Sequence, residues 1–196
     1  MQDLSNAVNH ALQQLEIPAL SLPTTQDYIG DGVRKLLERA LKNPDTALLD
    51  RGMRYFREFY TAHLFDYTSL YPGALAALDF FSSKHKVLLT NKPTEYAVPL
   101  VSHLKLEPYF STVLGGDSQY GLKPDPAGIL AMVEKYRVDP ERTLMIGDSK
   151  NDILAGQNAG VQTCAVTFGF RTEAQLRPLR PTYVINALDE LRNIVI

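Results

Sequence analysis

The chain has 196 residues, 45% of them apolar, and a formal net charge of −2. This length and apolar content suit one domain with an added module and a sizeable core. The nearly balanced charge gives no broad attraction to nucleic acid or to a membrane surface, so neither is expected as a partner.

Two further features of the sequence favour a cytoplasmic protein. No apolar run approaches the roughly eighteen residues of a membrane span, and the first residues have neither the basic start nor the apolar stretch of a signal peptide. The single cysteine, Cys164, has no partner for an internal disulfide and lies in an apolar run that favours a buried thiol.

The first 66 or so residues have helical periodicity only. Apolar residues recur at helical spacing over residues 3–15, 25–41 and 45–65. Gly30 and Gly32 flank Asp31 inside the second stretch and are expected to loosen or break that helix. We therefore predict a module made of helices alone, and we assign residues 1–70 to it.

After Tyr71-Pro72-Gly73 the pattern changes to short apolar runs separated by helical segments. The predicted strands are 87–90, 112–114, 143–146, 163–168 and 183–185, and the predicted helices are 74–83, 97–104, 127–136, 151–159 and 188–194. Short unbroken apolar strands that alternate with helices are typical of a parallel sheet covered on both faces. Residues 71–196 are therefore predicted to form an α/β domain.

Polar residues gather where these predicted strands end, and in open parallel sheets functional sites form at that edge. Asp148 and Asp152 could bind magnesium, which prefers oxygen ligands, and Lys123 could neutralise a phosphate. Thr90 and Asn91 offer donors for phosphate oxygens. Alone, each has an ordinary alternative as a helix cap, a solvated lysine or a loop residue. Their combination at successive strand ends favours a phosphoryl-transfer site.

Three motifs in this order resemble the haloacid dehalogenase superfamily of aspartyl-phosphate phosphatases. Within it, the chain most resembles bacterial phosphoglycolate phosphatases that carry a helical cap. The motifs are Leu89-Thr90-Asn91-Lys92-Pro93, Gly121-Leu122-Lys123-Pro124-Asp125-Pro126 and Ile146-Gly147-Asp148-Ser149-Lys150-Asn151-Asp152, and Ile29-Gly30-Asp31-Gly32-Val33 matches the cap. The resemblance implies a small phosphate ester as substrate and Mg²⁺ as cofactor.

The resemblance also implies a role for each matched residue. Thr90 and Asn91 would hold the transferring phosphoryl group, and Lys123 would offset the negative charge around it. Asp148 would bind Mg²⁺, and Asp152 would support the ion directly or through water. The predicted substrate-binding residues are Lys92 on the core and Gly30, Asp31, Gly32 and Arg34 on the cap.

One family motif, Asp-x-Asp-Gly-Thr at the end of the first strand, has no match in the chain. Its first aspartate is the nucleophile, which positioning alone does not replace. The fold expected is therefore a Rossmann-like three-layer core that lacks its first central strand, with a helical cap. We expect little or no phosphatase activity from this polypeptide. For the place of the missing strand, the expectation is that upstream residues omitted from this sequence fill it; otherwise the flanking strands close together or a second chain fills it, which would give a homodimer through the exposed strand edges.

The same residues are compatible with two classes of protein other than a phosphatase. A non-catalytic relative could use the same residues to bind phosphate or a protein partner, and the DNA upstream of Met1 would distinguish it from an enzyme with a misplaced start. A phosphoacceptor receiver domain also uses carboxylates, a threonine and a lysine. In a receiver domain the acidic pair follows the first strand, and no long helical module precedes it. The layout of this chain differs in both respects and excludes the receiver reading.

Overall fold

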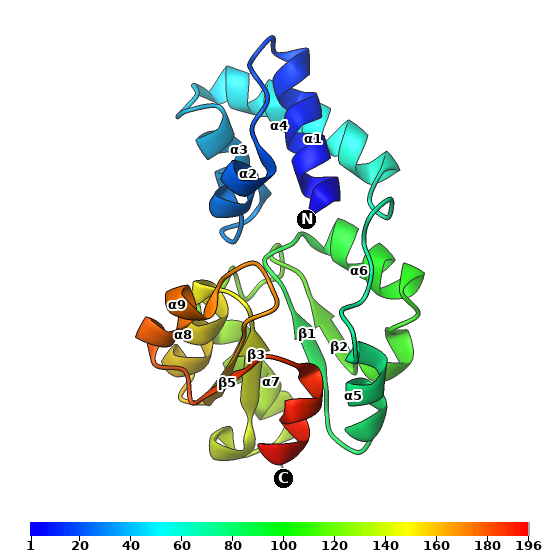
Figure 1. Ribbon diagram of the computed structural model, residues 1–196, viewed down its shortest axis with the longest axis vertical. Helices are drawn as coiled ribbons and strands as arrows, with labels where there is room; N and C mark the ends of the chain where they lie inside the picture. The colour runs from blue at the N-terminus through cyan, green and yellow to red at the C-terminus, as the bar shows by residue number, and fades with distance from the viewer. Residues whose placement is uncertain (196) are drawn as a thin grey trace.

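The computed structural model describes residues 1–195, and four helices at the start of the chain form a module above an α/β core (Figure 1). These helices are α1 (Gln2–Gln14), α2 (Leu22–Tyr28), α3 (Val33–Ala40) and α4 (Thr46–Ala62). Their apolar stripes meet in a core of their own, in which Val8, Leu12 and Phe56 are fully buried. The helical module follows from amphipathic patterning, as predicted.

The glycines of the second predicted helix interrupt it, as expected. Helix α2 ends at Tyr28 and α3 begins at Val33. Gly30 and Gly32 have φ angles of 134° and 87°, which side chains with a Cβ rarely adopt. The segment between the helices turns toward the α/β core as a result.

The core contains the five predicted strands, all in parallel ladders. They are β1 (Val87–Leu89), β2 (Thr112–Leu114), β3 (Leu144–Gly147), β4 (Gln162–Val166) and β5 (Tyr183–Ile185). The helices are α5 (Ala74–Phe80), α6 (Thr94–His103), α7 (Ala127–Tyr136), α8 (Lys150–Asn158) and α9 (Glu173–Leu176), with 3₁₀ helices η1 (Glu107–Tyr109), η2 (Pro140–Arg142), η3 (Arg177–Leu179) and η4 (Leu188–Asn193). The α/β class is confirmed. The helix predicted at 188–194 is a 3₁₀ helix, and the short helices at 107–109, 140–142 and 173–179 were not predicted.

The strands form two separate hydrogen-bonded groups, β1–β2 and β3–β4–β5. Within residues 1–195, no strand joins β1 to β3, so each has one edge without a ladder partner. Ile146 of β3 is 40% exposed, while Cys164 and Ala165 on the neighbouring β4 are fully buried. An apolar residue this exposed is unusual in a parallel sheet, which is normally covered on both faces. The arrangement agrees with the expected lack of a central strand.

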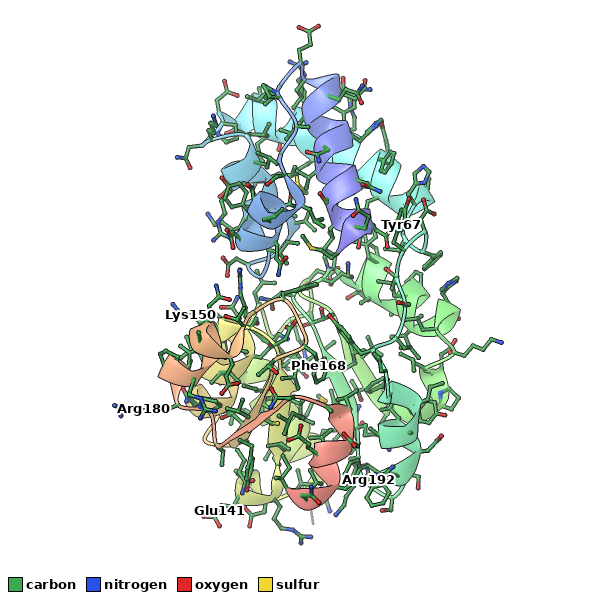
Figure 2. All side chains as sticks on the ribbon, viewed as in Figure 1. Tyr67, Glu141, Lys150, Phe168, Arg180 and Arg192 are labelled. Atoms are coloured by element: carbon green, nitrogen blue, oxygen red, sulfur yellow. The ribbon has the colours of Figure 1, made fainter. Side chains whose placement is uncertain are left out.

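The module and the core are joined by the segment between α4 and α5, which includes Tyr67 (Figure 2). The buried carboxylate of Asp3 accepts hydrogen bonds from Tyr67 N at 3.0 Å and Thr68 Oγ1 at 2.7 Å. The start of α1 therefore holds this connection in place. The domain boundary at 70/71 stays a prediction. No helix within residues 1–195 has the length and apolar character needed to cross a membrane.

Candidate active site

The carboxyl ends of β1 and β3 and the cap segment around Gly30 enclose a pocket of about 180 Å³. It brings together eight of the ten predicted site residues. The core supplies six of them: Thr90, Asn91, Lys92, Lys123, Asp148 and Asp152. The cap supplies the other two, Gly30 and Gly32. The pocket is also lined by Ser149 and Phe170 of the core and by Leu4, Ile29, Val33 and Leu36 of the cap. A larger hollow, lined by α1, residues 16–19 and Phe59 of α4, contains none of the predicted residues.

Lys123 and Asp152 form a buried ion pair at the centre of this rim. Lys123 Nζ lies 2.6 Å from Asp152 Oδ1, and the two side chains are only 10% and 7% exposed. The same ammonium donates to Leu89 O at 2.7 Å, at the end of β1. One lysine thus links the end of β1 to α8, across the two groups of strands. Removing one partner of such a pair would leave an uncompensated buried charge.

Asp152 also forms the capping box at the start of α8. Its Oδ2 accepts hydrogen bonds from Ser149 N at 3.0 Å and Ser149 Oγ at 2.6 Å, while Ser149 Oγ accepts from Asp152 N. The helix-capping alternative and the functional assignment are therefore compatible. Because both Asp152 oxygens already have donors, this carboxylate is better suited to orienting Lys123 than to binding a metal directly.

Asp148 is the carboxylate that fits a magnesium ion. Its Oδ2 accepts a hydrogen bond from Phe170 N at 2.7 Å. Burial raises the pKa of Asp148, and the nearby charge of Asp152 raises it further. A cation would relieve both effects. Among residues 1–195, no group of three or more His, Cys, Asp or Glu side chains could hold a metal ion. The remaining ligands would be water and substrate oxygens, as is usual for Mg²⁺.

The side-chain amide of Asn91 is fully used within the protein. Its Nδ2 donates to Gly30 O at 2.8 Å and Lys123 O at 2.9 Å, and its Oδ1 accepts from Lys123 N at 2.7 Å. In this conformation the amide positions Lys123 and the cap, which the sequence did not indicate. Thr90 Oγ1 accepts from Lys92 N at 3.1 Å, so its hydroxyl hydrogen can still be donated to a phosphoryl oxygen.

Lys92 places a partly buried ammonium between the core and the cap. Its Nζ donates to the hydroxyl of Tyr60 on α4 and lies 4.7 Å from the centroid of that ring. Burial lowers the pKa of Lys92 to about 8, an effect that the charge of Asp3 partly offsets. The same burial raises the pKa of Tyr60. Within residues 1–195 this ammonium forms no ion pair.

Two predicted cap residues lie outside the pocket lining. Arg34 is 57% exposed and faces Glu38 and Asp50 at 3.6 and 3.9 Å. Asp31 bonds to Arg39, and its Oδ1 accepts from Asn151 Nδ2 at 2.8 Å. Their contribution to substrate binding stays a prediction.

Two polar residues of the rim, Asn151 and Arg171, had no predicted role. Both follow predicted strands at the edge where sites form, which was the available signal. The structure turns both toward the cap segment at residues 27–31.

Comparisons with known proteins identify the family to which the chain is similar. Residues 2–166 match the family described as haloacid dehalogenase-like hydrolase. A phosphoglycolate phosphatase of Neisseria gonorrhoeae is 36% identical over 199 residues, covering 96% of this chain and 84% of that protein. A phosphoglycolate phosphatase of Vibrio parahaemolyticus is 33% identical, covering 98% and 89%. The crystal structure of a predicted phosphoglycolate phosphatase from Haemophilus somnus superposes with a TM-score of 0.94 at 26% identity, covering 100% of this chain and 91% of that one.

Proposed function

We propose that this chain, which belongs to the haloacid dehalogenase-like hydrolase family and is similar to phosphatases over nearly its whole length, takes a small phosphate monoester as its substrate. The observation that carries the proposal is the buried Lys123–Asp152 pair, which stands beside Asp148 and Thr90 in a single pocket. A fixed cation, a hydroxyl donor and a buried carboxylate at one point are the groups that bind and polarise a phosphoryl group.

Phosphoglycolate, or an ester of similar size, is the substrate we propose. The pocket volume of about 180 Å³ suits a phosphoryl group with a short leaving group. The cap contributes the apolar side chains of Leu4, Ile29, Val33 and Leu36 to the wall. The partly buried ammonium of Lys92 is available for a second anionic group, such as a carboxylate on the leaving group.

Each residue then has a defined task. The Thr90 hydroxyl donates to a phosphoryl oxygen, and the Lys123 ammonium offsets the charge of the bound group. Asp148 would hold Mg²⁺, and Asp152 keeps Lys123 in place. When bound, Mg²⁺ would supply further positive charge against the phosphoryl oxygens. Asn91 acts by holding the backbone of Lys123.

We further propose that a polypeptide of these 196 residues binds phosphate without turning over an ester. The residues include no Asp-x-Asp-Gly-Thr motif, and both oxygens of Asp152 are engaged while Asp148 is assigned to the metal. No carboxylate of the pocket is left to attack phosphorus.

A binding and turnover experiment tests the proposal. Calorimetry of the purified 196-residue polypeptide should detect binding of inorganic phosphate with Mg²⁺, and Lys123→Met should abolish it. Lys105→Met, which removes an exposed lysine, is the matched control. Equal binding by the Lys123 variant would refute the assignment of the site. Rapid Mg²⁺-dependent hydrolysis of phosphoglycolate would refute the proposed lack of turnover.

Two expectations from the sequence have no bearing on this test. The cytoplasmic location and the homodimer through strand edges both stay predictions. Size-exclusion chromatography with light scattering would check the second.

A further inference from the structure

Core side chains at three strand ends converge on one short piece of the cap, residues 27–31. Asn91 Nδ2 and Asn151 Nδ2 both donate to Gly30 O, at 2.8 and 3.0 Å. Asn151 Nδ2 also donates to Asp31 Oδ1 at 2.8 Å. The Arg171 guanidinium reaches Asp27 O at 3.3 Å and Ile29 O at 3.2 Å, and it pairs with Asp27 Oδ1 at 3.3 Å.

The opposite side of the cap is attached to the core by different chemistry. There Tyr96 of α6 packs edge-on against Tyr60 of α4 at 4.9 Å between ring centroids, and it is buried within the apolar core of the helical module. The connecting segment at Tyr67 is held by Asp3. Opening on that side would expose buried apolar surface. Opening at residues 27–31 breaks hydrogen bonds that water can replace, which costs little net free energy for each bond.

The cap therefore has a hinge on one side, where buried aromatic packing and the bonds of Asp3 and Lys92 hold it, and an accessible polar contact on the other. Gly30 and Gly32 also line the pocket, so the polar contact borders the proposed phosphate site directly. Asn91 connects that contact to the site, because the amide that holds Gly30 O also holds the backbone N and O of Lys123.

We propose that Asn151 and Arg171 are positioning residues that latch residues 27–31 onto the core, and that Asn91 couples the closed latch to the position of Lys123. With the latch formed, the cap closes the pocket and Lys123 is set against Asp152 and Leu89 O. With the latch broken, the cap swings about the side near Tyr96, and the pocket loses its cap wall. The predicted effect on phosphate binding rests on the proposed function, whereas the effect on the cap does not.

Cap opening can be measured without any ligand. Spin labels on Arg51→Cys, which is exposed on α4, and Glu141→Cys, which is exposed at the far end of the core (Figure 2), report the cap-to-core distance by pulsed electron resonance. Cys164 is fully buried and is not expected to react. We expect a single narrow distribution of label-to-label distances in the labelled protein that keeps Asn151 and Arg171.

The test variant is Asn151→Ala combined with Arg171→Ala. Loss of these donors should raise the ratio of open to closed molecules by about tenfold or more, because several hydrogen bonds are lost together. The matched controls are Asn158→Ala on the same helix and Arg177→Ala. Their side chains bond to Pro124 O and Glu173, both within the core. The controls should leave the distance distribution unchanged.

Asn151→Asp separates loss of the latch from loss of folding, since it keeps the size of the side chain. It places a second carboxylate against Asp31 and should open the cap further than Asn151→Ala does. A distance distribution that is the same in the double variant, Asn151→Asp and the parent would overturn the inference. So would an equal change in the controls.

Calorimetry with inorganic phosphate and Mg²⁺ gives the second readout. In the double variant the Kd should rise at least about fivefold, as expected when fewer molecules are closed. An unchanged Kd in an opened variant would overturn the coupling of the latch to the site. If the parent protein binds no phosphate, the proposed function fails, and the distance measurement still decides whether the latch exists.

Discussion

Replacing Lys92 by methionine should change how the stability of the protein depends on pH. Lys92 is a partly buried residue whose ammonium contacts Tyr60 and has no ion-pair partner in residues 1–195, and burial lowers its pKa from 10.5 to about 8. Between these values the unfolded chain binds more protons than the folded one, so this lysine makes stability rise with pH. Below pH 8 the folded state bears the full free-energy cost of burying the charged ammonium, and above pH 10.5 this cost is gone.

The size of the effect follows from the shift in pKa. A drop of 10.5 − 8 = 2.5 in pKa corresponds to about 3 kcal/mol, and most of it, about 2–3 kcal/mol, is relieved between pH 7 and pH 10. Urea unfolding of parent and Lys92→Met over this range measures it. The stability difference between the two should shift by that amount in favour of the parent as pH rises.

A control variant makes this measurement specific. Lys35→Met removes a lysine whose side chain is 59% exposed, and the difference from the parent should stay nearly constant over the same range. If the curves of the parent and of Lys92→Met stay parallel from pH 7 to pH 10, the ammonium is not buried in the way described, and the reasoning fails.

Three further variants test the rest of the site. Lys123→Met should destabilise the protein by roughly 3–5 kcal/mol in urea unfolding because it strands a buried carboxylate, and adding Asp152→Asn should recover part of that loss. Gly169→Ala would put a Cβ 2.2 Å from Asp148 Oδ2, so the carboxylate would have to move. Calorimetry should then find Mg²⁺ binding weakened at least about tenfold. Unchanged binding would exclude Asp148 as the ligand. Asp3→Ala removes the acceptor of two hydrogen bonds from the connecting segment and should cost about 1–3 kcal/mol, with faster hydrogen exchange at residues 64–70; a change below 0.5 kcal/mol, on the order of an ordinary surface substitution, would contradict it.

The elements of the fold were largely readable from local patterns. The strands at 112–114 and 183–185 and the helix at 127–136 have the predicted bounds, because each is a short apolar run or helical stripe between clear turn residues. The 3₁₀ helix at Leu188–Asn193 was predicted as an ordinary helix, since apolar spacing over so few residues does not distinguish the two. Short helices such as Glu173–Leu176 were not predicted, since so few residues show no clear helical spacing.

The site was readable only in part. Parallel strands end at one edge, so Thr90, Lys123 and Asp148 could be placed together from their positions after predicted strands. Which partner each side chain would take could not be predicted. The role of Asn91 in holding a phosphoryl group stays a prediction, and the structure adds that its amide holds Gly30 O and the backbone of Lys123. Arg34 was predicted to bind substrate from the cap, which stays a prediction, and its side chain faces Glu38 and Asp50.

The sequence by itself therefore determined the chemistry that is available: two carboxylates, a lysine and a threonine at strand ends, and no Asp-x-Asp-Gly-Thr. Only the tertiary structure decided how these groups are used. It paired Lys123 with Asp152, partly buried the ammonium of Lys92 under Tyr60, and turned Asn151 and Arg171 toward the cap. The physical reason is that periodicity and spacing report which face or end of an element a residue occupies. Hydrogen-bond partners, by contrast, depend on segments that lie up to 144 positions apart in the chain and meet only after folding.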